Sequence, residues 1–209
     1  MEQVRRFLRE APACSLFMVA CVVVYLVTAA QTGRLDDPVG TGPTFGSPLA
    51  WDLMMVAPEV TDHGEWWRLL TSALVHLNLI HLLMNMLVIG LVGRVLERSY
   101  GTAVTAVTMV VCAAGGGAAA LWLDPGTAVG GASTVAYGLF AMLVGDALHR
   151  GTDVRAPLIL IAINLVYSLT GGVSLAGHLG GLVSGAVVVL VLWLWRRLRG
   201  ARATSSPSS

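Results

Sequence analysis

Ser133 and His178 have the residue types that a nucleophile and its general base require. Ser133 follows Gly130-Gly131-Ala132 and stands at the start of an apolar segment. Nucleophilic hydrolysis needs a hydroxyl, a base within hydrogen-bond reach and donors aimed at the developing oxyanion. Glycines let backbone or substrate approach closely, and the start of a helix offers unpaired N–H groups. A serine at a helix start is more often only an N-cap, so this hypothesis depends on the other polar residues.

Small residues follow His178 at helical spacing. Gly181 and Gly185 lie three and seven residues further on, which places them on one face of a helix. Such a face lets membrane helices pack backbone to backbone, whatever the role of the histidine. The contact could bring His178 against the segment that Ser133 begins. Because no Asp or Glu occupies the same depth, the residues permit a Ser–His dyad without an acidic third member.

His81 and Asn85 are one helical turn apart and could donate hydrogen bonds to an oxyanion. A structural hydrogen-bonded pair is the alternative interpretation of these two residues. His76 would stand about 140° from His81 around a helix, so the two histidines would not share a face. The sequence also has no HExxH motif and no carboxylate at that depth. We therefore expect no metal site and no cofactor.

The segments that carry these residues are predicted to be membrane-spanning helices. Apolar residues make up 56% of the chain and charged residues only 12%, and the mean hydropathy is +0.75. Five segments contain no charged residue: 11–33, 69–93, 99–123, 125–145 and 156–195. About 20 helical residues cross a bilayer, so the first four segments hold one span each. The last is long enough for two spans with a turn at Gly171-Gly172, which predicts an all-α membrane protein with six spans.

The arginines predict the orientation, because cytoplasmic loops collect Arg and Lys. Only Arg34 and Arg68 fall on one side of the six-span arrangement. The other eleven fall on the opposite side: Arg5, Arg6, Arg9, Arg94, Arg98, Arg150, Arg155, Arg196, Arg197, Arg199 and Arg202. We therefore expect a multi-pass protein of the plasma membrane with both termini in the cytoplasm.

The domain organisation follows from this orientation. We expect a cytoplasmic N-terminus at 1–10, a membrane domain at 11–200 and a disordered, Ser/Pro-rich cytoplasmic tail at 201–209. The first loop, 31–67, lies outside, and its Trp residues suit the membrane interface. The first apolar run is expected to be a retained span and not a cleaved signal peptide. No basic stripe suggests nucleic acid as a partner, and three Cys inside predicted spans make a disulfide framework unexpected.

Three segments, in order, resemble the rhomboid family of intramembrane serine proteases. The first is Glu65-Trp66-Trp67-Arg68-Leu69-Leu70-Thr71 with His76 and His81-Leu82-Leu83-Met84-Asn85. The second is Gly131-Ala132-Ser133-Thr134-Val135-Ala136-Tyr137-Gly138, and the third is Gly177-His178-Leu179-Gly180-Gly181 with Gly185. The resemblance extends from about Glu65 to Trp195. Each motif is short, but three in series across the predicted spans are specific.

The resemblance implies a six-helix rhomboid-type bundle with a water-filled cavity open to the outside. By position, Ser133 would be the nucleophile and His178 the general base. The backbone N–H of Ser133 and the side chains of His81 and Asn85 would form the oxyanion site. Tyr137 would pack against the His178 ring, although ordinary core packing is an alternative. The substrates would be single-pass membrane proteins that come in past the fifth span and are cut near the outer face.

Thr134 stands where the family motif GxSG has its last glycine. Its bulk could crowd the oxyanion pocket or the contact between the fourth and sixth spans, and its hydroxyl could bond a preceding carbonyl. The alternative function is therefore a proteolytically inactive rhomboid-like protein that binds membrane clients. A transporter is disfavoured, since no span carries a buried charge. The sequence leaves the substrate and the oligomeric state open.

Overall fold

The structure is a computed structural model that describes residues 2–40, 46–169 and 173–204, and these residues are helical except for loops and one isolated β-bridge. The elements are α1 (Glu2–Glu10), α2 (Pro12–Thr32), α3 (Pro48–Leu53), α4 (Ala57–Thr61), α5 (Arg68–Thr71), the 3-10 turn η1 (Ser72–Leu74), α6 (Leu79–Val88), the π-helical turn η2 (Ile89–Gly93), α7 (Arg94–Tyr100), α8 (Thr102–Leu123), α9 (Ser133–Arg150), α10 (Arg155–Ser168) and α11 (Leu175–Thr204).

Four helices are long and apolar enough to cross a membrane: α2, the continuous helix Leu79–Tyr100, α8, and α11 over Leu175–Arg199. Helix α10 is apolar over Arg155–Val166 but shorter. Helix α9 has 18 residues and carries Asp146 and Arg150 near its end. The all-helical, multi-pass class is confirmed, and the count of six spans stays a prediction.

Helix α6 starts later than the charge pattern of 69–93 predicts. The side chain of Asn78 accepts a hydrogen bond from the His81 N–H at 2.8 Å, so Asn78 is the N-cap. His76 therefore precedes the helix. The prediction that His76 and His81 stand apart around one helix was wrong, because their ring centroids are 5.2 Å apart.

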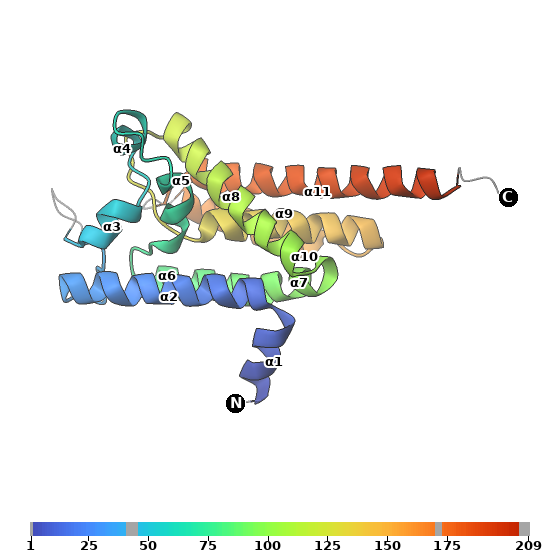
Figure 1. Ribbon diagram of the computed structural model, residues 1–209, viewed down its shortest axis with the longest axis horizontal. Helices are drawn as coiled ribbons and strands as arrows, with labels where there is room; N and C mark the ends of the chain where they lie inside the picture. Colours follow the sequence, from blue (N-terminus) through green and yellow to red (C-terminus); the bar gives the residue numbers. More distant parts are fainter. Residues whose placement is uncertain (1, 41–45, 170–172, 205–209) are drawn as a thin grey trace.

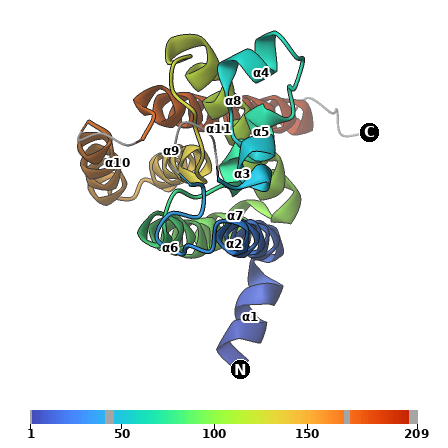
Figure 2. The ribbon, with the colours of Figure 1, turned by 90° about the vertical axis from the view of Figure 1, so that its left-hand side faces the viewer.

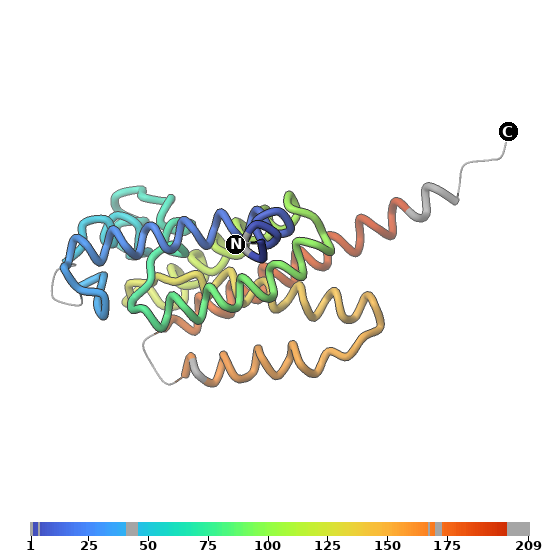
Figure 3. The backbone as a smooth tube through the Cα atoms, turned by 90° about the horizontal axis from the view of Figure 1, so that it is seen from below, coloured from blue at the N-terminus to red at the C-terminus, as the bar shows by residue number. Residues whose placement is uncertain are grey.

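Helix α11 packs mainly against α8 and α9: it runs beside α9, whereas α8 crosses the pair obliquely (Figures 1 and 2). The contact with α9 requires glycines on α11. A Cβ on Gly185 would lie 2.7 Å from the Cα of Gly138, and one on Gly181 would collide with the Thr134 backbone. Without side chains the two backbones approach closely, as the glycine spacing predicts. Helix α10 lies at the edge of the bundle (Figure 3).

The first loop is folded against the ends of these helices. The guanidinium of the buried Arg68 donates hydrogen bonds to the carbonyl oxygens of Trp51 and Met54. Met55 and Val129 form an antiparallel bridge with N–H···O distances of 3.0 and 2.9 Å. The loop thereby fixes the chain that leads into α9.

Two predicted features fall partly or wholly outside the described residues. The turn at Gly171-Gly172 lies outside them. Of the predicted tail, 201–209, the structure describes 201–204 as the end of α11, and the remainder lies outside. Cys14, Cys21 and Cys112 are buried free thiols.

Candidate active site

The fold brings Ser133 and His178 together from residues far apart in the chain. The Nε2 atom of His178 lies 2.8 Å from the Oγ of Ser133. Ser133 is the first residue of α9, and His178 is in the first turn of α11. Because the two helices meet through Gly181 and Gly185, the ring can reach the hydroxyl without a long side chain. The hydrogen bond has the geometry in which a histidine could accept a serine proton.

Ser168, at the end of α10, is a third member that the sequence analysis missed. Its buried Oγ lies 2.6 Å from the Nδ1 of His178 and 2.9 Å from the carbonyl oxygen of Asn164, to which it donates. With its proton given to Asn164, this hydroxyl accepts from an Nδ1–H. That tautomer leaves Nε2 unprotonated toward Ser133, as a general base requires. The sequence signal for this residue is a serine in the first half of the charge-free segment 156–195, whereas only acidic partners were expected for His178.

Tyr137 stacks on the other side of this arrangement. Its ring and that of His178 have centroids 4.4 Å apart at an interplanar angle of 20°. Its hydroxyl lies 3.3 Å from the Oγ of Ser168. Tyr137 therefore packs on the face of the His178 imidazole, and Ser168 contacts the ring edge at Nδ1, so the two together limit the rotation of the ring.

Gly131 opens a small space between His81 and Ser133. Gly131 has a φ of 144°, a conformation that residues with a side chain rarely adopt. A Cβ there would lie 2.6 Å from the His81 Cε1 atom, 2.9 Å from its Nε2 and 3.4 Å from the Ser133 Oγ. Both ring nitrogens of His81 are buried without a hydrogen-bond partner in the described part of the chain. An unsatisfied buried donor beside a nucleophile is what an oxyanion site needs before substrate binds.

Asn85 and His76 hold the surroundings of this space. The Nδ2 of Asn85 donates to the carbonyl oxygen of His81 at 2.8 Å, and a second amide proton remains for another acceptor. The Nε2 of His76 accepts from the backbone N–H of Ala132 at 3.5 Å, a weak bond. Gly131 N–H donates to Ser72 at 2.9 Å. The backbone before Ser133 is thus fixed by the region just before α6.

Thr134 points into a helix contact and away from the space at Gly131. Its Cβ would lie 2.5 Å from a Cβ on Gly116 of α8, and its Cγ2 would lie 3.6 Å from one on Gly177 of α11. The absence of a side chain at Gly116 makes room for the threonine. Its Oγ1 is buried and has no hydrogen-bond partner among the described residues, so it bonds no preceding carbonyl there.

The described residues contain no group of three His, Cys, Asp or Glu side chains placed to hold a metal ion. His76 and His81 are neighbours, but a structural metal site takes four ligands and a catalytic one three. The arrangement of hydroxyl, imidazole and buried donor suits acyl transfer to a serine instead.

Comparison with known proteins gives a single family. The model of the rhomboid domain matches residues 63–195. The chain is 31% identical over 140 residues to the rhomboid protease GluP of Bacillus subtilis, which covers 63% of this chain and 27% of GluP. It is 33% identical over 158 residues to the rhomboid protease GlpG of Photorhabdus laumondii, and the match covers 69% of this chain and 51% of GlpG. It is 31% identical over 165 residues to the mitochondrial RHOMBOID-like protein 6 of Arabidopsis thaliana, and the match covers 70% of this chain and 53% of that relative. The chain thus spans between 27% and 53% of the length of these relatives.

Proposed function

The chain belongs to the rhomboid family, and on this premise we propose that it is an intramembrane serine endopeptidase that cleaves single-pass membrane proteins near the outer membrane face. The observation that carries the proposal is the 2.8 Å contact between the Ser133 Oγ and the His178 Nε2 at the start of α9. The proposed reaction also requires that water reaches Ser133 from the outside and that the helices are embedded in a bilayer.

The reaction is a two-step acyl transfer. The Nε2 of His178 takes the proton of Ser133 as Oγ attacks the scissile carbonyl carbon, and the imidazolium gives that proton to the leaving amine. Water then hydrolyses the acyl-enzyme with His178 again as base. The backbone N–H of Ser133, the ring of His81 and the second amide proton of Asn85 stabilise the oxyanion.

Ser168 acts as a positioning residue in this mechanism. It does not touch the substrate, but it accepts from Nδ1–H and so keeps Nε2 free for Ser133. Tyr137 supports the same orientation by stacking. Because α10 lies at the edge of the bundle and ends at Ser168, a substrate helix that displaces α10 would also disturb this bond.

A cleavage assay tests the proposal. The full chain, reconstituted in liposomes with a single-pass substrate, is compared with Ser133→Ala on a gel. We expect a cleaved product only with the unaltered chain. Equal cleavage by Ser133→Ala would overturn the serine mechanism. The alternative, an inactive protein that binds membrane clients, rests on Thr134 in place of the last glycine of GxSG. It predicts that neither form cleaves the substrate and that Ser133→Ala still binds it.

Topology needs a separate test. The six-span arrangement places both termini in the cytoplasm and the first loop, 31–67, outside. Reporter fusions after Arg202 and inside the loop should give opposite signals. Matching signals would contradict the proposed orientation and leave the dyad geometry to be explained in another membrane topology.

A further inference from the structure

A cavity of about 630 Å³ lies between α7, α9 and α11, at the end of the bundle opposite to Ser133. Helices α9 and α11 are in close contact up to Gly145, where a Cβ would meet the side chain of Val189. Beyond that point α9 ends at Arg150 while α11 continues. The cavity occupies the wedge that opens between them.

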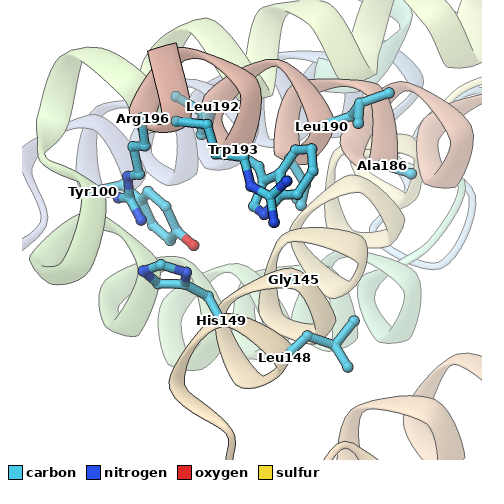
Figure 4. Close-up of a pocket in the computed structure, with 11 residues that line it drawn as sticks. Tyr100, Gly145, Leu148, His149, Ala186, Leu190, Leu192, Trp193 and Arg196 are labelled. Carbon is cyan, nitrogen blue, oxygen red and sulfur yellow. The ribbon is translucent and has the colours of Figure 1, made fainter. Parts of the chain in front are cut away.

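The inner walls of the cavity are apolar. Leu148 of α9 and Ala186, Leu190 and Trp193 of α11 line it (Figure 4). From Ala186 to Arg197 the helix rises by about 16 Å, close to half of a hydrocarbon core that is about 30 Å thick. The whole cavity, from its apolar wall to its basic rim, therefore matches the depth of one hydrocarbon leaflet.

The outer rim of the cavity is basic. Arg196 and Arg197 line it with Tyr100 and His149, and Figure 4 shows Tyr100 and His149 near each other at one end. The guanidinium of Arg196 lies 5.2 Å from the Tyr100 ring centroid, and that of Arg197 lies 4.0 Å from the ring of Trp193.

Among the described residues no carboxylate forms an ion pair with Arg196 or Arg197, and the nearest one, that of Asp146, contacts the Tyr100 hydroxyl. The lining contains no Asp or Glu, and Asp146 of α9 pairs with Arg150 at 2.8 Å. At the same end of the bundle Arg94 is paired with Glu10, whereas the partners of Arg196 and Arg197 within the described ranges are aromatic rings. Two guanidinium groups without a carboxylate partner in the described ranges lie beside an apolar wall. This lining is complementary to a ligand with an anionic headgroup and an apolar chain.

We propose that this cavity binds an anionic phospholipid of the adjoining leaflet, with its phosphate at Arg196 and Arg197 and an acyl chain along Trp193 and Leu190. In the proposed orientation this is the cytoplasmic leaflet, which carries the negative lipids, and basic pockets between membrane helices hold such headgroups. The site is separate from the dyad and does not depend on proteolysis. The proposed lipid would contact the ends of α9 and α11 that lie opposite to Ser133 and His178.

Quenching of Trp193 tests the proposal. The full chain is placed in phosphatidylcholine nanodiscs that contain a minor share of acyl-brominated lipid, either phosphatidylglycerol or phosphatidylcholine. The Trp193 signal is obtained by subtracting the emission of Trp193→Phe. We expect brominated phosphatidylglycerol to quench at a lower mole fraction than phosphatidylcholine, by about fivefold for each arginine that contacts the phosphate.

Three variants separate a bound lipid from general attraction to the surface. The double variant R196Q/R197Q should abolish the difference between the lipids. Arg199→Gln removes one positive charge outside the cavity, over Trp195, and should keep the difference. Ala186→Phe keeps every charge but fills the apolar wall, and it should lower the quenching by phosphatidylglycerol. Equal quenching by both lipids, or equal losses in Arg199→Gln and the double variant, would overturn the proposal. Relief of quenching by inorganic phosphate would identify a free anion as the occupant and also overturn it.

Discussion

The Oγ of Ser168 lies 2.6 Å from the Nδ1 of His178, while the Nε2 of the same ring lies 2.8 Å from the Oγ of Ser133. One imidazole is therefore held between two serine hydroxyls from different helices. A buried neutral hydroxyl takes the place in which serine hydrolases on other folds have a carboxylate. Such a partner fixes the tautomer without placing a charge in an apolar bundle, where an unpaired carboxylate is costly.

Loss of Ser168 should slow cleavage without unfolding the protein. A neutral hydrogen bond contributes roughly 1 kcal/mol, so Ser168→Ala should lower kcat by about fivefold and change KM little. Ser184→Ala is the matched control, since it removes a hydroxyl of α11 that faces Gly115 and not the dyad. Ser168→Thr, which keeps a hydroxyl, should recover part of the rate. A loss shared equally by the control, or a change in KM alone, would contradict a positioning role.

Ser133 and His178 should behave as one unit. Residues that act together in catalysis show losses that do not add. Ser133→Ala, His178→Ala and the double variant should therefore have the same residual rate in single-turnover cleavage of one substrate. Thermal unfolding in the same detergent checks that each variant is folded. Full cleavage by either single variant would remove the dyad mechanism.

His81 should contribute to the rate through the transition state. Loss of one oxyanion donor typically costs on the order of 3 kcal/mol, a hundredfold or more in rate. His81→Ala should show this loss in kcat with little change in stability, because its ring nitrogens have no partner to lose among the described residues.

Asn85→Ala should slow cleavage by a similar factor and also cost stability. The reason is that it loses the 2.8 Å bond to the His81 carbonyl. If Asn85→Ala destabilises the fold while the folded fraction cleaves at the normal rate, Asn85 is structural.

Gly116 and Thr134 should be energetically coupled. Gly116→Ala would place a Cβ 2.5 Å from that of Thr134 and 3.0 Å from the Gly177 carbonyl oxygen, so it should destabilise the protein by roughly 1–3 kcal/mol. Thr134→Gly removes the first contact, and the double variant should be more stable than the sum of the single changes predicts. Chemical denaturation in one detergent measures all four forms.

Thr134→Gly also tests the inactive alternative. Because its side chain faces α8 and α11, we expect the cleavage rate of the folded protein to stay unchanged. If the unaltered chain is inert and Thr134→Gly cleaves, Thr134 is an inactivating substitution and the client-binding function holds.

His63 in the first loop should make stability depend on pH. Its Nδ1 lies 2.7 Å from the Oε2 of Glu59, and this hydrogen bond raises the pKa of His63 above its ordinary value of 6.5. The fold therefore prefers the protonated form. The stabilisation is complete below pH 6.5 and is lost as the pH rises through the folded-state pKa. The melting temperature of His63→Gln should be lower than that of the unaltered chain at about pH 5 and equal to it at about pH 8. Glu59→Gln should weaken this pH dependence, although Glu65 and Asp62 also raise the pKa of His63. A pH dependence of the same size in Glu59→Gln would contradict the role of the Glu59 hydrogen bond.

The sequence by itself determined the membrane class and the residues that meet in the site. Charge-free segments of sufficient length specify spanning helices, because a bilayer excludes unpaired charge. The glycines after His178 indicated which faces of α9 and α11 approach, since backbone contact needs small residues at helical spacing. Ser133, His178 and Tyr137 could be named because rare polar types in apolar helices stand out.

Only the tertiary structure decided the partners of these residues. Ser168 is an ordinary serine until the placement of α10 brings it to the His178 ring. His76 lies beside His81 because Asn78 caps α6 and leaves His76 in the preceding loop, where helical periodicity says nothing. Thr134 fits because Gly116, on another helix, leaves room for it. Periodicity describes one helix at a time, whereas these contacts depend on how several helices are placed, which no local pattern encodes.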